Sequence, residues 1–533
     1  MDDTTNQPTG NGKIGAVMVV GAGIGGMQAA LDLANAGFHV TLVEETTAIG
    51  GRMAQLDKTF PTNDCSMCTI SPKLIEVDKH LNIDIVTNAD VVGLEGEAGD
   101  FRVKVLKRPR FVDLAKCNAC GDCIQKCPVQ VPSEFDQGTM TRKAIFKRYP
   151  QAIPGGMAIS KADRAPCVLT CPAHVNCQGY AALIADGRFA EAYDLIRQRN
   201  PFPAACGRIC HHPCESKCNR RELDQAVAIN HLKRFAADWV AEKRAAGEEV
   251  APPAKAEIDP AKAPVAVIGG GPAGLTAARE LALRGYPVTL FEAHEKLGGT
   301  MLLGIPAYRL PDDVLDRDIA DVVAAGFEVQ TGKALGRDFT FETLKQQGYR
   351  AAFLAIGCTK PATLARSTDG SPMKGTDLDG VLLGLDFLRE VKLGRGPKLH
   401  GKVVVIGGGN VAIDVAMTAR RQGAEQVEIV CLERREEMPA HEWEIQDAVD
   451  EAVRLNPGWG PREFVGREGK VTGVRLQRCV SVFDAQRRFD KAANDQSTQG
   501  PLSLPSASAP ISRSSGRTIR SGIPRNASSR STS

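Results

Sequence analysis

The chain has 533 residues, 43% of them apolar, which is enough for several domains that each bury a core of their own. The last 43 residues hold six Lys and Arg and one Asp, so they contribute +5 to the formal net charge of +3; the −2 left for the rest excludes an extended basic surface for nucleic acid. Because no apolar run reaches the roughly 18 residues that span a bilayer, and the polar N-terminus resembles no export signal, we expect a cytoplasmic protein without direct membrane insertion.

A strand, a glycine-rich turn and a helix of small residues follow the polar N-terminus. The apolar run 16–20 leads into this turn, and a second apolar run, 40–43, ends at an acidic residue. In Rossmann-type folds such glycines allow a tight turn and close approach of a pyrophosphate, while the acid accepts a ribose hydroxyl. A double glycine downstream fits a flavin site better than a nicotinamide site. The candidate cofactor-binding residues are Gly21, Gly23, Gly26, Glu44 and Gly51.

A ferredoxin-type 4Fe-4S module is expected at residues 108–155. The first unit, residues 1–107, is therefore expected to be an incomplete Rossmann FAD-binding unit, because nothing before this module closes the pocket. Four cysteines have the bacterial ferredoxin spacing, with two, two and three residues between them. The fourth ligand stays open, since the cysteine before proline or one of Cys65 and Cys68 can complete the cluster; a zinc site is the alternative. The candidate ligands are Cys117, Cys120, Cys123 and Cys127.

A second group of cysteines lies in residues 156–250, which we expect to form an α-helical iron–sulfur domain. Thirteen of the 16 cysteines of the chain lie between Cys65 and Cys218, and such crowding in a cytoplasmic chain favours metal ligation over disulfides. Three cysteines spaced by four, together with one before proline, can hold one cluster; three others would need a non-cysteine ligand for a second. These two sets are Cys210, Cys214, Cys218 and Cys171, then Cys167, Cys177 and Cys206.

A linker rich in Ala, Pro and Lys, residues 251–264, precedes a second Rossmann unit. This unit, residues 265–395, repeats the glycine pattern with the same 23-residue interval from first glycine to acid, and again has a double glycine downstream. We expect an FAD-binding domain that lacks its closing segment. Its candidate residues are Gly269, Gly271, Gly274, Glu292 and Gly299.

A third strand–glycine–helix pattern predicts an NAD(P)-binding domain at residues 396–490. Here alanine replaces the last glycine of the fingerprint, and two arginines follow the second strand, where they suit the 2′-phosphate of NADP. Glu433, next to them, favours the free ribose hydroxyl of NAD. NADP is preferred modestly over NAD. The candidate residues are Gly407, Gly409, Ala412, Arg434 and Arg435.

The segment 491–533 differs in composition from everything before it. Twelve of its 43 residues are serine, and it has no hydrophobic periodicity, so we expect a disordered tail. Codons that are compatible with residues 506–514 can, when they are read from the third base, encode a sequence typical of the end of a strand. This favours the hypothesis of a frameshift, which resequencing of the gene tests.

Two resemblances cover most of the chain. The segments 50–61 (GGRMAQLDKTFP) and 64–68 (DCSMC) resemble the N-terminal part of the heterodisulfide reductase A subunit over residues 14–155. The segments 206–210 (CGRIC) and 304–311 (GIPAYRLP) resemble the small subunit of glutamate synthase and the N-terminal half of dihydropyrimidine dehydrogenase over residues 160–490. The resemblance places Lys233 where the pyrimidine enzyme has a glutamine ligand.

These resemblances imply an α/β protein with Rossmann-type FAD and NAD(P) units, inserted ferredoxin-like and α-helical iron–sulfur modules, and a disordered C-terminal tail. They further imply an iron–sulfur flavoprotein oxidoreductase in which NAD(P)H reduces FAD and 4Fe-4S clusters pass electrons to a partner subunit. That partner would be heterodisulfide-reductase-like or glutamate-synthase-like. The hydride step requires no acid–base residue, so no catalytic side chain is predicted. The alternative function is a non-catalytic cluster-bearing scaffold or an inactive truncated fragment.

Overall fold

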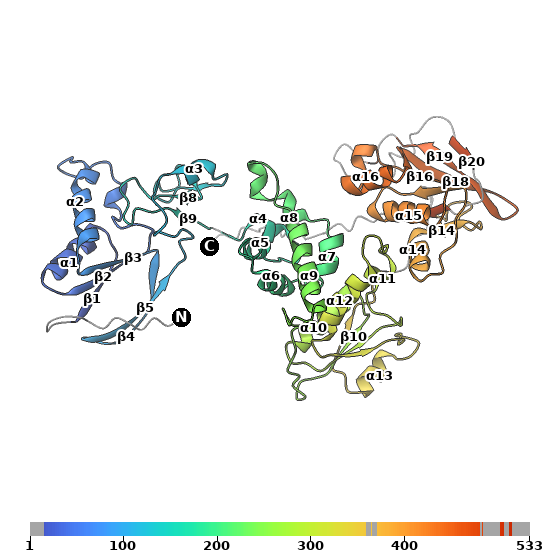
Figure 1. Ribbon diagram of the computed structural model, residues 1–533, viewed down its shortest axis with the longest axis horizontal. Helices are drawn as coiled ribbons and strands as arrows, with labels where there is room; N and C mark the ends of the chain where they lie inside the picture. Colours follow the sequence, from blue (N-terminus) through green and yellow to red (C-terminus); the bar gives the residue numbers. More distant parts are fainter. Residues whose placement is uncertain are drawn as a thin grey trace. The chain divides into compact units, whose positions relative to one another are not determined.

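The computed structural model describes residues 15–161, 163–358, 364, 370–479, 482, 502–505 and 511–513. They fall into two compact units, residues 1–169 with 217–227 and residues 170–216 with 228–533 (Figure 1). The expected 156–250 domain is therefore divided between the two units, and the expected domain boundaries stay a prediction.

The first unit opens with half of a Rossmann fold. Three parallel strands lie in the order β1-β2-β3, the order expected when each strand returns through a helix. Apolar side chains of α1 and α2, such as Met27 and Leu74, are buried against Leu42 in the sheet. The elements are β1 (Ala16–Val20), α1 (Ile24–Asn35), β2 (His39–Glu44), η1 (Met53–Gln55), α2 (Ser66–Lys79) and β3 (Ile83–Thr87).

A hairpin and the ferredoxin-type segment follow this half fold. The hairpin strands are antiparallel, and the ferredoxin-type segment folds back onto the Rossmann core, where Tyr149 and Ala152 are buried. The hydroxyl of Tyr149 donates to the carbonyl of Ile49, and the amide of Ile49 donates to Ile153 O at 2.9 Å. The elements are β4 (Ala89–Glu97), β5 (Asp100–Lys107), α3 (Asp122–Lys126), β6 (Gln130–Pro132), β7 (Thr141–Lys143), β8 (Ile145–Phe146), β9 (Ala158–Ile159), α4 (Pro166–Thr170) and η2 (Asn219–Glu222).

The second unit begins with a group of helices. A Cβ at Gly207 would lie 2.8 Å from Arg234 Cα, so glycine is needed for α7 to approach α9 this closely. Asp318 of the following domain accepts the amides of Ala204 (3.3 Å) and Ala205 (2.7 Å) at the start of α7. The helices are α5 (Cys177–Ala185), α6 (Phe189–Arg197), α7 (Pro203–Ile209), α8 (Pro213–Ser216) and α9 (Ile229–Ala245).

A four-stranded parallel sheet, β12-β11-β10-β13, forms the expected FAD-type domain. Its central strands, β10 and β11, are buried along their whole length, as strands covered on both faces are. The elements are β10 (Val265–Ile268), α10 (Pro272–Ala282), β11 (Val288–Phe291), α11 (Thr300–Leu303), α12 (Asp312–Val323), β12 (Glu328–Gln330), α13 (Phe341–Gln346) and β13 (Ala351–Leu354).

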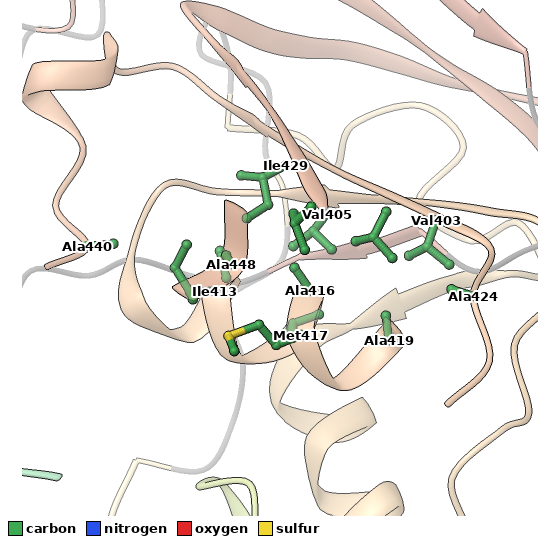
Figure 2. Close-up of a cluster of buried hydrophobic side chains, with 14 of the residues drawn as sticks. Val403, Val405, Ile413, Ala416, Met417, Ala419, Ala424, Ile429, Ala440 and Ala448 are labelled. Atoms are coloured by element: carbon green, nitrogen blue, oxygen red, sulfur yellow. The ribbon is translucent and has the colours of Figure 1, made fainter. Parts of the chain in front are cut away.

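The third Rossmann-type domain has a five-stranded parallel sheet, β14-β21-β15-β16-β17, and a three-stranded antiparallel sheet, β18-β19-β20. Figure 2 shows its core, where Ile413, Ala416 and Met417 of α15 lie against Val405 and Ile429 of the sheet. The elements are β14 (Val381–Leu383), α14 (Gly384–Lys392), β15 (Lys402–Ile406), α15 (Asn410–Arg421), β16 (Gln426–Cys431), η3 (Arg435–Glu437), α16 (Glu442–Asp450), β17 (Val453–Pro457), β18 (Trp459–Arg467), β19 (Lys470–Arg478), β20 (Leu502–Pro505) and β21 (Ile511–Arg513).

Two of these strands, β20 and β21, belong to the tail that the sequence predicts to be disordered. β21 pairs with β14 and β15, and β20 pairs with β19. The rest of 491–533 lies outside the described residues, so the frameshift hypothesis and the expected disorder of that part stay predictions. Among the helices of the described ranges, none has both the length and the apolar character that crossing a membrane requires.

Candidate dinucleotide and iron–sulfur sites

The second glycine loop links β10 to α10 and is tied to the acidic residue that ends the next strand. The amide of Gly270 donates to Glu292 Oε2 at 2.6 Å, and the amide of His294 donates to Glu292 Oε1 at 2.8 Å. Glu292 is buried, so its carboxylate is fixed beside the loop. This is the place where a carboxylate accepts a ribose hydroxyl in Rossmann-type sites.

Two glycines, one in this loop and one packed against it, are required by close contacts. A Cβ at Gly274 would lie 1.8 Å from Gly269 O, and one at Gly299 would lie 2.8 Å from Gly271 Cα. Gly271 itself has only an ordinary contact of 3.8 Å, so the space in front of it is open to a ligand. The loop therefore leaves the start of α10 accessible to a pyrophosphate, and the residues present fit the ADP half of FAD.

The first glycine loop has the same geometry. The amide of Ala22 donates to Glu44 Oε2 at 2.8 Å, and Thr46 donates to Glu44 Oε1 through its amide and its hydroxyl. A Cβ at Gly26 would lie 1.8 Å from Gly21 O, the distance found at Gly274. The two loops thus form an internal structural repeat, and all five residues predicted in the first unit lie in it.

A cavity of about 840 Å³ lies beside Glu44 in the first unit. One wall is the Rossmann half, with Gly51 and Arg52; the other comes from the ferredoxin-type segment and the residues around it. That segment adds four cationic side chains that the sequence analysis did not single out: Arg108, Arg110, Arg142 and Arg148.

Arg110 donates hydrogen bonds to backbone carbonyl oxygens on both sides of this cavity, as follows. Arg110 donates to Thr47 O (2.7 Å) and Met157 O (3.0 Å), which joins the two walls. Burial lowers the pKa of Arg148, and the carboxylates of Glu44 and Glu134 oppose that shift. Basic residues flanking the cysteine motif were the available sequence signal, because a pyrophosphate needs cations or helix N-termini.

Strand β13 forms an edge of the FAD-type sheet and is exposed throughout. Phe353 and Leu354 are 44% and 53% exposed, and Ile356 just beyond is 58% exposed. Apolar side chains in such a place normally pack against further structure. The absence of a closing segment stays a prediction.

The third glycine loop, between β15 and α15, is closed by the segment after β16. Ala440 N donates to Gly408 O at 3.1 Å, and His441 N donates to Asn410 Oδ1 at 3.0 Å. A Cβ at Gly408 would lie 2.9 Å from Glu433 Oε2, so this carboxylate lies against the loop as Glu44 and Glu292 do. Burial raises the pKa of Glu433.

The two arginines predicted to bind a 2′-phosphate follow Glu433 at the start of η3. Arg435 pairs with Glu442 at 2.9 and 2.5 Å. Arg435 is partly exposed and Glu442 is largely exposed, and ion pairs at the surface are weak and readily exchanged for another anion. Arg434 caps η3, and its amide donates to Glu437 at 3.3 Å. Both arginines therefore follow directly on the carboxylate that lies against the loop.

The ferredoxin-type cysteines lie in a loop around α3. Met157 N donates to Cys117 Sγ at 3.4 Å, and this bond and that of Ala119 lower the pKa of the Cys117 thiol. Gly156 packs against the same thiol, because a Cβ there would lie 3.9 Å from Cys117 Sγ and 2.1 Å from Leu114 Cδ2. Amide donors around a thiolate are what a cluster ligand requires.

In the helical domain the structure brings Cys177 to both Cys171 and Cys214. Its thiol is hydrogen-bonded to each of them, and the bond lowers the pKa of Cys171 to about 5. The sequence had placed Cys177 in the other group of three, because linear spacing does not show which turn of a helix faces which loop. Burial instead raises the pKa of Cys206 to about 11.

Lys233 of α9 lies among these thiols. It is buried, and its positive charge lowers the pKa of Cys171, Cys206 and Cys214. A buried ammonium beside several thiols stabilises their thiolate forms. Lys233 was identified from the resemblance as replacing a glutamine ligand, but not as a charge shared by three cysteines.

In the second unit, the thiol of Cys177 meets those of Cys171 and Cys214. Within the residues that the structure describes, no three or more His, Cys, Asp or Glu side chains are arranged as a metal site. The donor set still fits an iron–sulfur cluster by its chemistry, since soft thiolates with nearby positive charge are what iron–sulfur clusters bind. Cys167 and Cys218 belong to the first compact unit.

Cys65 and Cys68 form a separate pair at the start of α2. Cys68 N donates to Cys65 Sγ at 3.2 Å, and the thiol of Cys68 also donates to it, which lowers the pKa of Cys65 and raises that of Cys68. Their neighbours are each other, Met67 and Asp57. The possibility that one of them completes the ferredoxin-type cluster stays a prediction.

Comparison with known families gives three matches. Residues 142–245 match the dihydropyrimidine dehydrogenase domain II, 4Fe-4S cluster family; residues 263–476 match the pyridine nucleotide-disulphide oxidoreductase family; and residues 19–72 match the NAD(P)-binding Rossmann-like domain family. The α/β class with Rossmann-type and iron–sulfur modules is confirmed. The matches also support FAD, 4Fe-4S clusters and NADP as cofactors, in agreement with the prediction.

Individual relatives agree with both resemblances. The chain is 40% identical over 332 residues to the NADP(+)-dependent formate dehydrogenase subunit beta of Moorella thermoacetica, which is 59% of this chain and 46% of that protein. It is 41% identical over 321 residues to the NADPH-Fe(3+) oxidoreductase subunit beta of Geobacter sulfurreducens, again 59% and 46%. It is 56% identical over 142 residues to an iron–sulfur A-type subunit of the CoB–CoM heterodisulfide reductase of Methanopyrus kandleri, which is 27% and 22%.

The chain thus spans about half of the first two relatives and under a quarter of the third. Its N-terminal region is homologous to heterodisulfide reductase A subunits, and its larger region is homologous to NADPH-dependent iron–sulfur oxidoreductase beta subunits. Each of these relatives is named as a subunit of its enzyme.

Proposed function

We propose that this chain is an electron-input subunit of an iron–sulfur flavoprotein oxidoreductase. The nicotinamide dinucleotide binds on the third glycine loop, between Gly407 and Arg435, and FAD binds on the second, between Gly269 and Gly299. Thiol-bound clusters of the helical and ferredoxin-type segments conduct electrons to a partner subunit. The same proposal includes a cytoplasmic location.

One observation supports this function above the others. Two glycine loops that differ in the segment packed against them lie in one compact unit. The loop next to Glu292 is contacted by the double glycine at 298–299, whereas the loop next to Glu433 is contacted by Ala440. The same unit holds the contact of Cys177 with Cys171 and Cys214. A flavin-type site, a nicotinamide-type site and a thiol cluster together are the parts of a two-electron to one-electron converter.

The protein's own contribution is binding and orientation. Glu292 and Glu433 hold ribose hydroxyls, and the starts of α10 and α15 face the pyrophosphates. When bound, FAD accepts a hydride and releases electrons singly to the clusters. A hydride passes directly between two rings, so the side chains around them have to exclude water and fix the distance rather than transfer a proton.

The choice between NADP and NAD depends on Glu433, Arg434 and Arg435. We propose that Arg435 leaves Glu442 for the 2′-phosphate, because an exposed ion pair costs little to break. NADPH is therefore the proposed donor, as in the names of the two larger relatives.

The first unit is proposed to bind a second FAD in the cavity beside Glu44, with the ferredoxin-type segment as its second wall. The partner is proposed to be heterodisulfide-reductase-like or glutamate-synthase-like, and to accept electrons from the cluster at Cys117–Cys127. Capture of a partner encoded next to the gene tests this part.

The experiment for the function as a whole is a cofactor assay of matched variants. Flavin, iron and acid-labile sulfide are measured in anaerobically prepared wild type, G271A and C171S. We expect G271A to lose the flavin of the second loop, and so part of its total flavin, with its iron retained, and C171S to lose the iron of the helical segment, and so part of its total iron, with its flavin retained. Equal contents in all three proteins would contradict the assignment of these sites.

A cluster-bearing scaffold without bound flavin is the second candidate, and the exposure of Phe353 and Leu354 on β13 favours it. An FAD pocket left open on that side would bind flavin weakly. The same assay separates the two candidates, because a scaffold contains iron and sulfide but no flavin in any of the three proteins.

A further inference from the structure

A single arginine of the FAD-type domain makes two ion pairs with the NAD(P)-type domain. Arg309 lies in the segment 304–311, which follows the double glycine and α11. Its Nη1 contacts both carboxylate oxygens of Asp414 at 3.0 and 2.9 Å, and its Nη2 contacts Glu444 Oε1 at 2.5 Å. Asp414 is on α15 and Glu444 is on α16, so one guanidinium joins both helices to the other domain.

Both carboxylates are buried and depend on this arginine. Asp414 and Glu444 are each 6% exposed, and burial raises the pKa of both, against the effect of Arg309. Glu444 Oε2 is buried and has no hydrogen-bond partner among the described residues. Removing one member of a buried charge network leaves the others uncompensated, so the contact is strongly dependent on all three.

Asp414, one of the two partners of Arg309, is also bonded to the neighbouring tyrosine of the same segment. Tyr308 donates to Asp414 at 3.3 Å, and the guanidinium of Arg421 lies 3.8 Å from the centre of the Tyr308 ring. These side chains line a cavity of about 390 Å³ between the segment 304–311 and the two helices. The segment 304–311 therefore contacts the NAD(P)-type domain through several side chains, and not through Arg309 alone.

A second contact reaches the start of α16 from the helical domain. The ring of His441 stacks on Trp443 at 4.5 Å and on His211 at 5.6 Å, and Trp443 stacks on His212 at 4.7 Å. The helix that bears Glu444 is thus fixed at its first turn as well. Its orientation decides where the third glycine loop faces, because His441 N is bonded to Asn410 in that loop.

We propose that Arg309 is a positioning residue that holds the NAD(P)-type domain in the orientation required for hydride transfer to the FAD-type domain. The proposal rests on the proposed function. Arg309 binds neither dinucleotide itself: without it each domain keeps its own ligand, but the two rings no longer meet. A misplacement of about 1 Å between reacting groups is enough to lower a rate by about a hundredfold.

The test compares R309M with two other variants. R317M is the matched control, because Arg317 lies in the same domain and pairs with Asp313 at 3.4 Å on the surface. R309M/D414N/E444Q removes the same two ion pairs without leaving an unpaired buried charge. It therefore still tests the proposal if R309M alone folds poorly. Each protein is assayed for flavin content, for the Kd of NADP+ and for the rate of flavin reduction by NADPH and by dithionite.

We expect R309M and the triple variant to keep the flavin content and the Kd of NADP+, to be reduced by dithionite as wild type is, and to be reduced by NADPH at least about tenfold more slowly. R317M should match wild type throughout. Reduction of the triple variant by NADPH at the wild-type rate would overturn the proposal.

Hydrogen exchange supplies a test that does not depend on activity. The amides of Arg309 and Leu310 donate to Pro306 O, and those of α16 are intrahelical. We expect faster exchange in both segments of R309M and of the triple variant, with α10 unchanged. If wild type is not reduced by NADPH, the proposed function fails, yet the exchange result still decides whether Arg309 joins the domains; unchanged exchange would show that it does not.

Discussion

Glu44 and Glu292 occupy equivalent positions in two separate glycine-loop units. Each carboxylate accepts a hydrogen bond from the amide of the residue after the first glycine of its loop, Ala22 at 2.8 Å and Gly270 at 2.6 Å. Each also accepts a hydrogen bond from the amide two residues after itself, that of Thr46 or of His294. The agreement extends to Gly26 and Gly274. Because the two loops agree in these hydrogen bonds and in this close contact, we infer that both bind the same part of a dinucleotide, the ADP half.

The glycines of the second loop have separable roles, and this gives a first prediction. G274A places a Cβ 1.8 Å from Gly269 O and is expected to destabilise the protein by more than about 2 kcal/mol. G271A meets only a 3.8 Å contact, so its stability should equal that of wild type when both are flavin-free, while its flavin content as purified falls. Thermal unfolding and flavin quantification check both variants. Equal stability of G274A and G271A would contradict the packing argument.

A second prediction concerns the pH dependence of stability. Burial raises the pKa of Asp318 to about 7 from an ordinary value of 3.8, and the amides of Ala204 and Ala205 offset part of that shift. Between these two values the folded state binds more protons than the unfolded state, so this group's contribution to stability is lost as pH rises. D318N has no such titration. The Tm of wild type minus that of D318N should therefore fall from pH 5 to pH 7.5, whereas a constant difference would show that Asp318 does not titrate here.

A third prediction concerns Lys233, whose charge favours the thiolate of Cys171. K233M is expected to raise the pKa of that thiol, which is about 5 in wild type, and to slow its alkylation by iodoacetamide at about pH 5 in cluster-free protein. K243M is the control, because Lys243 lies on the same helix and pairs with Glu248 at the surface. Mass spectrometry of Cys171 follows the reaction. If K233M and K243M react at the same rate, the charge of Lys233 does not act on this thiol.

The glycine loops and cysteine motifs could be predicted from the sequence because their chemistry is local. Gly274 and Glu292 are close along the chain, and the spacing alone fixes what each must contact. Of the two N–H donors to Cys117, only that of Ala119 lies within the ferredoxin-type spacing; Met157 is 40 residues away along the chain. The fold class follows from the alternation of such units with helices.

The remaining features depend on contacts between distant segments. The amide of Ile49 bonds Ile153, so the ferredoxin-type segment that was expected to leave the first pocket open supplies its second wall. Arg309 meets Asp414 and Glu444 more than a hundred residues away. Nothing in the spacing of these residues indicates the pairing, because it depends on how one domain packs on another.

The central claim is that electrons enter from a nicotinamide and leave through flavin and clusters in this one chain. The most direct measurement is the anaerobic absorbance of the purified protein during titration with NADPH, and separately with NADH. We predict loss of flavin absorbance followed by bleaching of the iron–sulfur absorbance, with NADPH more effective than NADH. Flavin-loaded protein whose spectrum neither nucleotide changes, although dithionite bleaches it, would contradict the claim.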